Sequence, residues 1–285
     1  DALGQSTKIR HVLARHEQGA GFIAQGMARA TGEVAVCMAS SGPGATNLLT
    51  AIADAKLDSI PLVAITGQVP RAMIGTDAFQ EVDTYGLTIP ITKHNFLVSS
   101  ADELLEVIPR AFAIAASGRP GPVVIDIPKD VQTQVIEVSE WPEPASRVLP
   151  PPAAANAIAE AAAMINAAHR PLLYLGGGVV HAGASHVAVD LAEKANLPTV
   201  MTLMAMGTMP VDHPLSLGML GMHGARYCNF ALDECDLLIA IGARFDDRAT
   251  GKVAAFCPQA RIIHIDIDPA ELDKIKAAHI GITAD

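Results

Sequence analysis

Short runs of consecutive apolar residues alternate along the chain with longer segments in which apolar residues recur every three or four positions. Runs of the first kind cover residues 34–39, 61–66 and 122–127, and each is bounded by Gly or Pro nearby. A segment of the second kind covers residues 101–117, and another leads from the first run to residue 56. Continuous apolar runs predict strands buried on both faces, and the periodic segments predict helices. The first half of the chain therefore predicts βαβ units, with a parallel sheet covered by helices on both faces.

A proline-rich segment at residues 139–152 interrupts this pattern. It contains Trp141-Pro142-Glu143-Pro144 and three consecutive prolines at 150–152, which cannot continue a helix or a central strand. We interpret it as an interdomain linker. After it the pattern restarts with a helix from residue 153 and a helix that ends at 196; the predicted strands cover residues 172–175, 199–202, 236–241 and 261–265. The predicted fold class is α/β, with two domains at 1–138 and 153–285 that each hold a parallel sheet flanked by helices.

Composition narrows the class of protein. Half of the 285 residues are hydrophobic (50%) and 18% are charged, which excludes a disordered chain. The net charge of −10 argues against nucleic acid and anionic membrane surfaces as partners, and no apolar run approaches the roughly 18 residues of a membrane span. The four cysteines show no CxxC spacing, so we expect free, mostly buried thiols in a cytoplasmic protein.

Glu17 is the first candidate for chemistry. It opens a predicted helix that is rich in Gly and Ala. A Glu in the first turn of a helix is most often a solvated charge that the helix dipole favours. The small residues also allow close backbone approach, and a Glu17 carboxyl held in an apolar pocket would have a raised pKa and keep a proton at neutral pH.

Two loops of the first half lie where α/β sheets bind ligands. Ser41-Gly42-Pro43-Gly44 joins a predicted strand to a helix, whose N-terminus favours anions. It is not a Walker loop, because no Gly-Lys-Ser/Thr follows, and a plain tight turn explains it equally well. Residues 77–83 combine three carboxylates with an aromatic ring and an amide, which is typical of a functional loop or of a solvated acidic turn.

Glycines and methionines mark the second half. Gly176-Gly177-Gly178 follows a predicted strand, but His181 occupies the last Gly position of a dinucleotide fingerprint, so the triplet predicts only close approach to a flat group. Six methionines between residues 201 and 222 fill a core or line a cofactor slot. His223 follows them with no second metal ligand at a suitable spacing, so no metal site is assigned.

Charged residues follow the last two predicted strands. Arg244 and Arg248 are placed to bind a carboxylate or phosphate, unless they pair with the acids of their own segment. Asp266 ends the next strand, where an acid accepts hydrogen bonds from ribose hydroxyls.

Seven motifs, taken in order, resemble the biosynthetic acetolactate synthase (acetohydroxyacid synthase) large-subunit family, and most of all its bacterial isozyme I type. They cover residues 15–19, 41–47, 75–81, 118–122, 126–130, 221–224 and 242–248. The resemblance runs along nearly the whole chain. It implies an enzyme that uses thiamine diphosphate, Mg²⁺ and a non-redox FAD. Such an enzyme decarboxylates pyruvate and condenses the product with pyruvate or 2-oxobutyrate, the first common step of branched-chain amino-acid biosynthesis.

The resemblance also implies roles for single residues. Glu17 matches the glutamate that contacts the pyrimidine nitrogen of thiamine diphosphate. Phe79 and Gln80 match residues beside the reacting centre, Lys129 matches a lysine at the substrate entrance, and Arg248 matches the arginine that holds the second substrate's carboxylate. The implied cofactor contacts are Glu17, Gly42, Asn47, Gln80, Arg119, Gly176, Gly177, Gly178, Met222, His223, Gly224, Gly242, Ala243, Arg244, Asp266, Ile267 and Asp268.

The family pattern extends beyond this chain. Family members carry a third, diphosphate-binding domain with the Mg²⁺ ligands, and a glycine-rich N-terminal strand. We therefore expect a fragment, in which residues 1–138 form an incomplete pyrimidine-binding domain and 153–285 a central FAD-binding domain. The family implies a homodimer or higher homo-oligomer and a small regulatory subunit. The alternatives are another thiamine-diphosphate carboligase or decarboxylase, or a non-catalytic nucleotide-binding paralogue.

Overall fold

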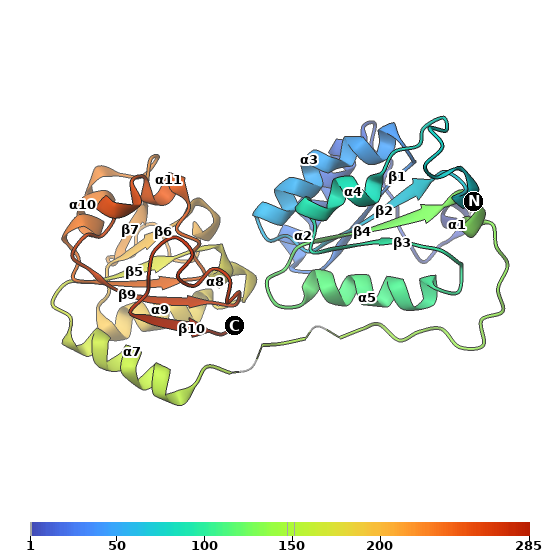
Figure 1. Cartoon of the computed structure of the whole chain (residues 1–285). Helices are drawn as coiled ribbons and strands as arrows, with labels where there is room; N and C mark the ends of the chain where they lie inside the picture. The colour runs from blue at the N-terminus through green and yellow to red at the C-terminus, as the bar shows by residue number, and fades with distance from the viewer. Residues whose placement is uncertain (1, 147, 151) are drawn as a thin grey trace. The chain divides into compact units, whose positions relative to one another are not determined.

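Figure 1 shows a computed structural model of the chain, which describes residues 2–146, 148–150 and 152–285. The chain divides into two compact units, Asp1–Val148 and Leu149–Asp285, called unit 1 and unit 2 here. The division falls within the proline-rich segment at 139–152. Between Gln132 and Ala155 the described residues form no helix or strand.

Unit 1 contains a four-stranded parallel sheet with the strand order β1-β2-β4-β3. Helices α2 and α3 lie on one face of this sheet and α5 on the other (Figure 1). The strands are β1 (Ala35–Ala39), β2 (Leu62–Gln68), β3 (His94–Leu97) and β4 (Pro122–Pro128). The helices are α1 (Ala2–Gln5), α2 (Glu17–Thr31), α3 (Pro43–Leu57), η1 (Arg71–Met73), α4 (Thr84–Thr88), η2 (Ile89–Ile91), α5 (Leu104–Ala116) and α6 (Lys129–Gln132).

Strand β2 shows why its sequence is continuously apolar. Leu62 and Ala64 pack into the cluster formed with α2 and α3, whereas Val63 packs into the cluster formed with α5. All three side chains are fully buried. A parallel strand covered on both faces has no solvent side to carry polar residues, which confirms the predicted buried strands.

The small residues of α2 allow it to pack closely on α3. A Cβ atom added to Gly21 would stand 2.5 Å from the Cβ of Ala51, so neither helix could keep its place with a larger residue there. This contact fixes the start of α2, and with it Glu17, against α3.

Unit 2 contains a six-stranded parallel sheet with the order β10-β9-β8-β5-β6-β7. Alternate residues of β5 separate its two cores: Leu173 and Leu175 pack with α7 and α9, and Leu172 and Tyr174 pack with α10. The strands are β5 (Pro171–Leu175), β6 (Thr199–Met201), β7 (Ser216–Met219), β8 (Leu237–Ile241), β9 (Arg261–Asp266) and β10 (Ile280–Thr283). The helices are α7 (Ala155–Ala167), α8 (Gly177–His181), α9 (Ser185–Ala195), η3 (Leu203–Ala205), α10 (Arg226–Glu234), α11 (Asp247–Thr250) and η4 (Val253–Ala255).

Three strands fall outside the predicted ones. They are β3, β7 and β10, and each lies at an edge of its sheet. Their sequences lack the continuous apolar run on which the prediction relied, whereas β1, the fourth edge strand, has such a run and was predicted.

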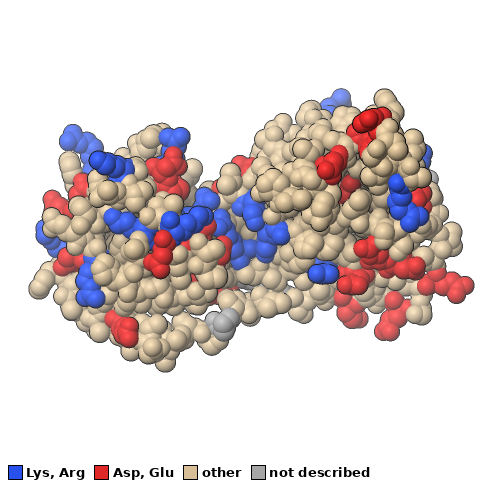
Figure 2. All heavy atoms as spheres, in the orientation of Figure 1, with Lys and Arg blue, Asp and Glu red and all other residues tan. Residues whose placement is uncertain are grey.

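Cysteine burial and surface charge follow the composition. All four cysteines are free and buried, as predicted, and burial raises the pKa of the Cys37 thiol to about 12. On the face drawn in Figure 2, acidic and basic side chains are interspersed on both units. Among the described residues no helix has the length and apolar character needed to cross a membrane.

Candidate active-site residues

The carboxyl ends of β1, β2 and β4 carry most of the predicted site residues of unit 1. These strands are neighbours and parallel, so the loops that leave them start from one edge of the sheet. The loop after β1 passes through Gly42 into α3, and the loop after β2 covers residues 69–83. Strand β4 leads directly into Lys129, the exposed first residue of α6.

Glu17 is the first residue of α2 and is half-buried. Its carboxylate accepts a hydrogen bond from Asn47 Nδ2 at 3.0 Å, from the first turns of α3. This bond, with smaller contributions from the helix start and from His16, places the pKa of Glu17 below its usual value. Of the two interpretations weighed for Glu17, the structure supports the charged carboxylate at the helix start, because too little apolar surface covers the carboxylate to outweigh the hydrogen bonds.

The turn before α3 touches two separate site segments. A Cβ atom on Gly42, whose φ is +58°, would stand 2.6 Å from the carbonyl oxygen of Gln80. A Cβ atom on Gly44 would stand 2.5 Å from Ser40 Oγ and 3.5 Å from Glu17 Oε1. The two glycines therefore let Glu17 and the Gln80 backbone approach the same turn, which brings together three segments that are far apart in the sequence.

Glu81 organises the loop that carries Phe79 and Gln80. Its carboxylate accepts hydrogen bonds from the backbone N–H groups of Gly75, Thr76 (3.2 Å) and Ala78 (3.1 Å). These N–H groups, Gly75 first, lower the pKa of Glu81, so the carboxylate stays charged and the loop stays closed on it. Gln80 has a φ of +59°, and the Phe79 side chain is 87% exposed. The hydrogen bonds to Glu81 thus hold the loop in place while the Phe79 ring is exposed to solvent.

Arg119 does not join these residues. It lies just before β4, at the opposite edge of the sheet, and its Nε donates to Ser59 Oγ at 2.8 Å. Its implied role as a flavin contact stays a prediction.

In unit 2 the glycine turns after β5 and β8 interlock. The Gly178 N–H donates to the Gly242 carbonyl at 3.1 Å, and the Gly242 N–H donates to the Ile265 carbonyl at 2.8 Å. A Cβ atom on Gly176 would stand 2.0 Å from Gly242 O. Gly176 and Gly178 therefore approach the neighbouring turn of Gly242 and the buried Ala243 closely, and the approach of the triplet to a flat group stays a prediction.

A second turn of unit 2 brings Met222 to Arg248. The Met222 N–H donates to the Arg248 carbonyl at 2.9 Å, and Arg248 Nη1 lies 3.8 Å from Met222 Sδ. His223 is exposed beside them, and a Cβ atom on Gly224 would meet the Met219 carbonyl at 2.3 Å. The Arg248 side chain also lies 3.7 Å from Asp247, so the pairing within the segment that we weighed is partly realised.

The remaining predicted residues of unit 2 lie at the carboxyl ends of β8 and β9. Arg244 is half-buried. Asp266 is buried, and its Oδ1 accepts the N–H of Asp268 at 2.9 Å, which closes the turn through Ile267. Because β5, β8 and β9 are parallel neighbours, the loops that carry these groups start from the same end of the sheet, at the carboxyl ends of the strands.

Comparison with known proteins decides the family. Residues 1–87 match the model of the thiamine pyrophosphate enzyme N-terminal TPP binding domain, and residues 158–285 match that of the central domain. The whole chain is 68% identical to the acetolactate synthase isozyme 1 large subunit of Escherichia coli K12, half of which it covers. The chain belongs to the acetolactate synthase large-subunit family. It is also 52% identical, over 97% of its length, to the isozyme 2 large subunit of that organism.

The likeness to acetolactate synthases extends to an archaeon. The chain is 52% identical over its full length to the probable acetolactate synthase large subunit of Methanocaldococcus jannaschii, of which it covers 49%. The chain thus spans about half the length of the acetolactate synthases that it matches.

Gln68 was missed from the sequence, and Glu81 and Asp126, which lie within the motifs singled out there, were given no role of their own. Asp126 is an acid inside an otherwise apolar strand, and that break in the pattern was the available signal. The roles of Gln68 and Glu81 depend on backbone groups that only the folded loop brings near.

Proposed function

We propose that this chain carries the pyrimidine-binding and central parts of an acetolactate synthase. The enzyme would decarboxylate pyruvate and join the two-carbon product to pyruvate or 2-oxobutyrate. The observation that carries the proposal is the convergence of Glu17, Asn47 and the Gln80 backbone on the turn at Gly42 and Gly44. Family membership supplies the reaction class, and this cluster supplies the groups that such a reaction needs.

The polar groups around Glu17 fit an aminopyrimidine ring. A carboxylate at the edge of the sheet, held by Asn47 and backed by a glycine turn, offers an acceptor to a ring nitrogen beside a flat backbone surface. Bound thiamine diphosphate supplies carbanion chemistry, which no side chain of the protein provides. Glu17 would share a proton with the ring nitrogen, and the covering of the carboxylate by the ring would raise the pKa of Glu17 from its present low value.

Residues next to this cluster are proposed to handle the substrate. The exposed Phe79 ring would pack on the methyl group of the oxo acid, and Gln80 would lie beside the reacting carbon. Lys129, exposed at the end of the adjacent strand, would attract the substrate carboxylate. Arg248 lies in unit 2 and is not part of this cluster; it is proposed to hold the carboxylate of the second oxo acid, for which its planar guanidinium is suited.

The donor set of unit 2 fits a nucleotide cofactor. Arg244 and His223 offer positive or polar groups for a diphosphate, and Asp266 offers a carboxylate for ribose hydroxyls. The proposal assigns FAD to this edge, with Gly176, Gly177, Gly178, Gly242 and Ala243 as its backbone wall and Ile267 and Asp268 beside it. Mg²⁺ belongs to the proposed set of cofactors, and no residue of this chain is proposed as its ligand.

Assembly and location belong to the same proposal. The names of the relatives specify large subunits, which supports a small regulatory subunit as partner. A homodimer or higher homo-oligomer, in a cytoplasmic setting where 2-oxo acids are available, completes the proposal.

The test is acetolactate formation from pyruvate by the full-length protein that contains these residues. The assay contains thiamine diphosphate and Mg²⁺ and is run with and without FAD. We expect product that depends on FAD in the presence of thiamine diphosphate and Mg²⁺. Glu17→Gln should lower the rate by about 100-fold or more, because it removes a group that takes part in proton transfer.

The matched control is Glu33→Gln, which makes the same change at an exposed residue just beyond the other end of α2 and should keep full activity. A folded protein without acetolactate synthesis would overturn the proposal. Decarboxylation alone, or carboligation of another aldehyde, would then identify a different thiamine enzyme, and no turnover at all would identify a non-catalytic paralogue.

A further inference from the structure

Two carboxylates flank Lys129 in the segment at the end of β4, and neither belongs to the site described above. Asp126 is buried in the strand, with 1% of its surface exposed. Asp130 follows Lys129 in α6 and is half-buried. Asp130 contacts the start of the loop at residues 69–83, which carries Phe79 and Gln80, and Asp126 is linked to the end of that loop through Gln68.

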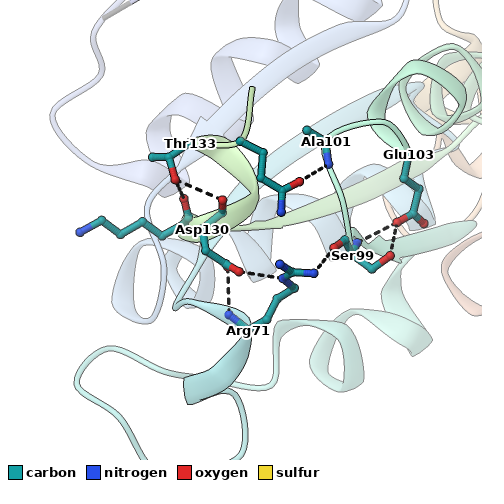
Figure 3. Close-up of polar contacts among 8 residues, drawn as sticks. Arg71, Ser99, Ala101, Glu103, Asp130 and Thr133 are labelled. Atoms are coloured by element: carbon teal, nitrogen blue, oxygen red, sulfur yellow. Dashed lines mark hydrogen bonds and ion pairs between the residues drawn. The ribbon is translucent and has the colours of Figure 1, made fainter. Parts of the chain in front are cut away.

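Asp130 holds the start of the loop through Arg71, the first residue of η1. Arg71 Nε donates to Asp130 Oδ2 at 2.7 Å, and the Arg71 backbone N–H donates to Asp130 Oδ1 at 3.0 Å (Figure 3). Arg71 Nη1 also donates to the Ser99 carbonyl, whose own N–H and Oγ donate to Glu103. The Arg71 backbone N–H and guanidinium lower the pKa of Asp130, which keeps this acceptor charged.

Asp126 holds the end of the loop through Gln68, the last residue of β2. Gln68 Nε2 donates to Asp126 Oδ2 at 3.0 Å and to the Val82 carbonyl at 2.8 Å. Thr66 Oγ1 donates to the other oxygen, Oδ1, at 2.7 Å. Both hydrogens of the Gln68 amide are therefore used, one on the strand and one on the loop.

The contacts of Asp126 and those of Asp130 act on the same loop, and both residues lie at or just after the end of β4. We propose that Asp126 and Asp130 are positioning residues that clamp both ends of the loop at 69–83 and so fix Phe79 and Gln80 relative to Lys129. The catalytic side of this inference rests on the proposed function, because it needs those three residues to act on one substrate. The clamp itself rests only on the contacts with Arg71, Gln68 and Val82.

The experiment compares Asp130→Asn with wild type in the full-length protein by amide hydrogen exchange. Peptides covering residues 70–76 should exchange about five- to tenfold faster in the variant, because the Arg71 N–H and guanidinium lose a charged acceptor. Peptides from α2 and α3 should not change. Asp130→Glu, which keeps the carboxylate, should restore most of the protection.

Kinetics supply the second measurement. Asp130→Asn should lower kcat/KM for pyruvate about tenfold, since a small displacement of positioned groups is costly, while the Kd for thiamine diphosphate stays unchanged. Arg71→Gln should have the same effect, and the double variant should be no worse than either single one. The matched control, Glu106→Gln, removes an exposed ion pair with Arg110 on α5 and should change neither exchange nor kinetics.

Unchanged exchange at residues 70–76 in Asp130→Asn would overturn the clamp. Additive losses in the double variant would also overturn it, because they would show that Arg71 and Asp130 act separately. If the wild type makes no acetolactate, the proposed function fails and the exchange result still decides the clamp. Hydrogen exchange of residues 81–84 in Asp126→Asn tests the other end of the loop. If this substitution of a buried residue unfolds the domain, the Asp130→Asn variant still tests the clamp, because Asp130 is only half-buried.

Discussion

Glu17 accepts its strongest hydrogen bond from Asn47, and this bond keeps the carboxylate ionised in the chain as it stands. The proposed chemistry needs a proton at the same atom. The two states are compatible if ligand binding itself moves the pKa, because a ring that covers the carboxylate removes water and offers a nitrogen with which to share the proton.

Thiamine diphosphate binding should therefore take up a proton at Glu17. Calorimetric titrations of the full-length protein at neutral pH, in buffers of different ionisation enthalpy, should show an uptake that is absent in Glu17→Gln. The difference between the two proteins removes the cofactor's own ionisation from the comparison. Equal uptake in both would show that Glu17 does not receive the proton.

Asp126 makes stability depend on pH in the opposite sense to most carboxylates. Burial raises the pKa of Asp126 from 3.8 to about 6, with a smaller contribution from Asp83, against the hydrogen bonds from Thr66 and Gln68. Between these values the folded state binds a proton that the unfolded state has lost, so stability increases as pH falls. The full effect corresponds to about 3 kcal/mol.

Urea unfolding of wild type and Asp126→Asn between pH 7 and pH 4 checks this expectation, followed by hydrogen exchange in peptides spanning β4. The wild type should gain stability relative to the variant, which has no ionisable group there, as pH falls through 6. A difference that stays constant with pH would show that Asp126 titrates normally.

At the scale of elements, the turns after β5 and β8 are the tightest junction of unit 2. Gly176→Ala places a methyl group 2.0 Å from the Gly242 carbonyl, a backbone atom that cannot rotate away. We expect a loss of about 3 kcal/mol or more in the free energy of unfolding of unit 2, measured by urea denaturation. Gly26→Ala serves as control, because a Cβ atom there, on α2 of unit 1, would meet no other atom. This substitution should raise the free energy of unfolding of unit 1 by up to about 1 kcal/mol. Equal stability of Gly176→Ala and wild type would contradict the interlocked turns.

Sequence patterns predicted the central elements well and the junctions between them poorly. Strands such as β2 and β4 are buried on both faces, so their apolar runs alone predict them. The contact between Gly42 and Gln80 left no local trace, since it depends on a positive φ at both residues and on two loops that meet only in the folded sheet. The hydrogen bond that lowers the pKa of Glu17 could not be predicted for the same reason, because its donor, Asn47, lies on another helix.

At the scale of the whole chain, the described residues between Gln132 and Ala155, which connect the two sheets, form a long and mostly exposed stretch without helix or strand. Trp141 is 76% exposed, and Glu140 and Glu143 beside it are exposed too. A protease specific for Glu should cut first at Glu140 or Glu143 and yield two fragments of similar size that resist further cleavage. Mass spectrometry of the first products checks this. A first cut within α5 or α9 would show that a unit is less stable than its buried core indicates.

The clamp on the loop at 69–83 has a consequence for protein engineering. The loop brings the guanidinium and backbone N–H of Arg71 and the carbonyl of Val82 to its ends, but their partners lie outside it: Asp126 in β4, Asp130 in α6 and the bridging amide of Gln68 in β2. Transplanted alone into another parallel-sheet scaffold, the loop would arrive without its anchors. The smallest transferable piece is therefore the pair of strands β2 and β4 with both following segments, so that graft designers should treat residues 62–83 and 122–130 as a single part.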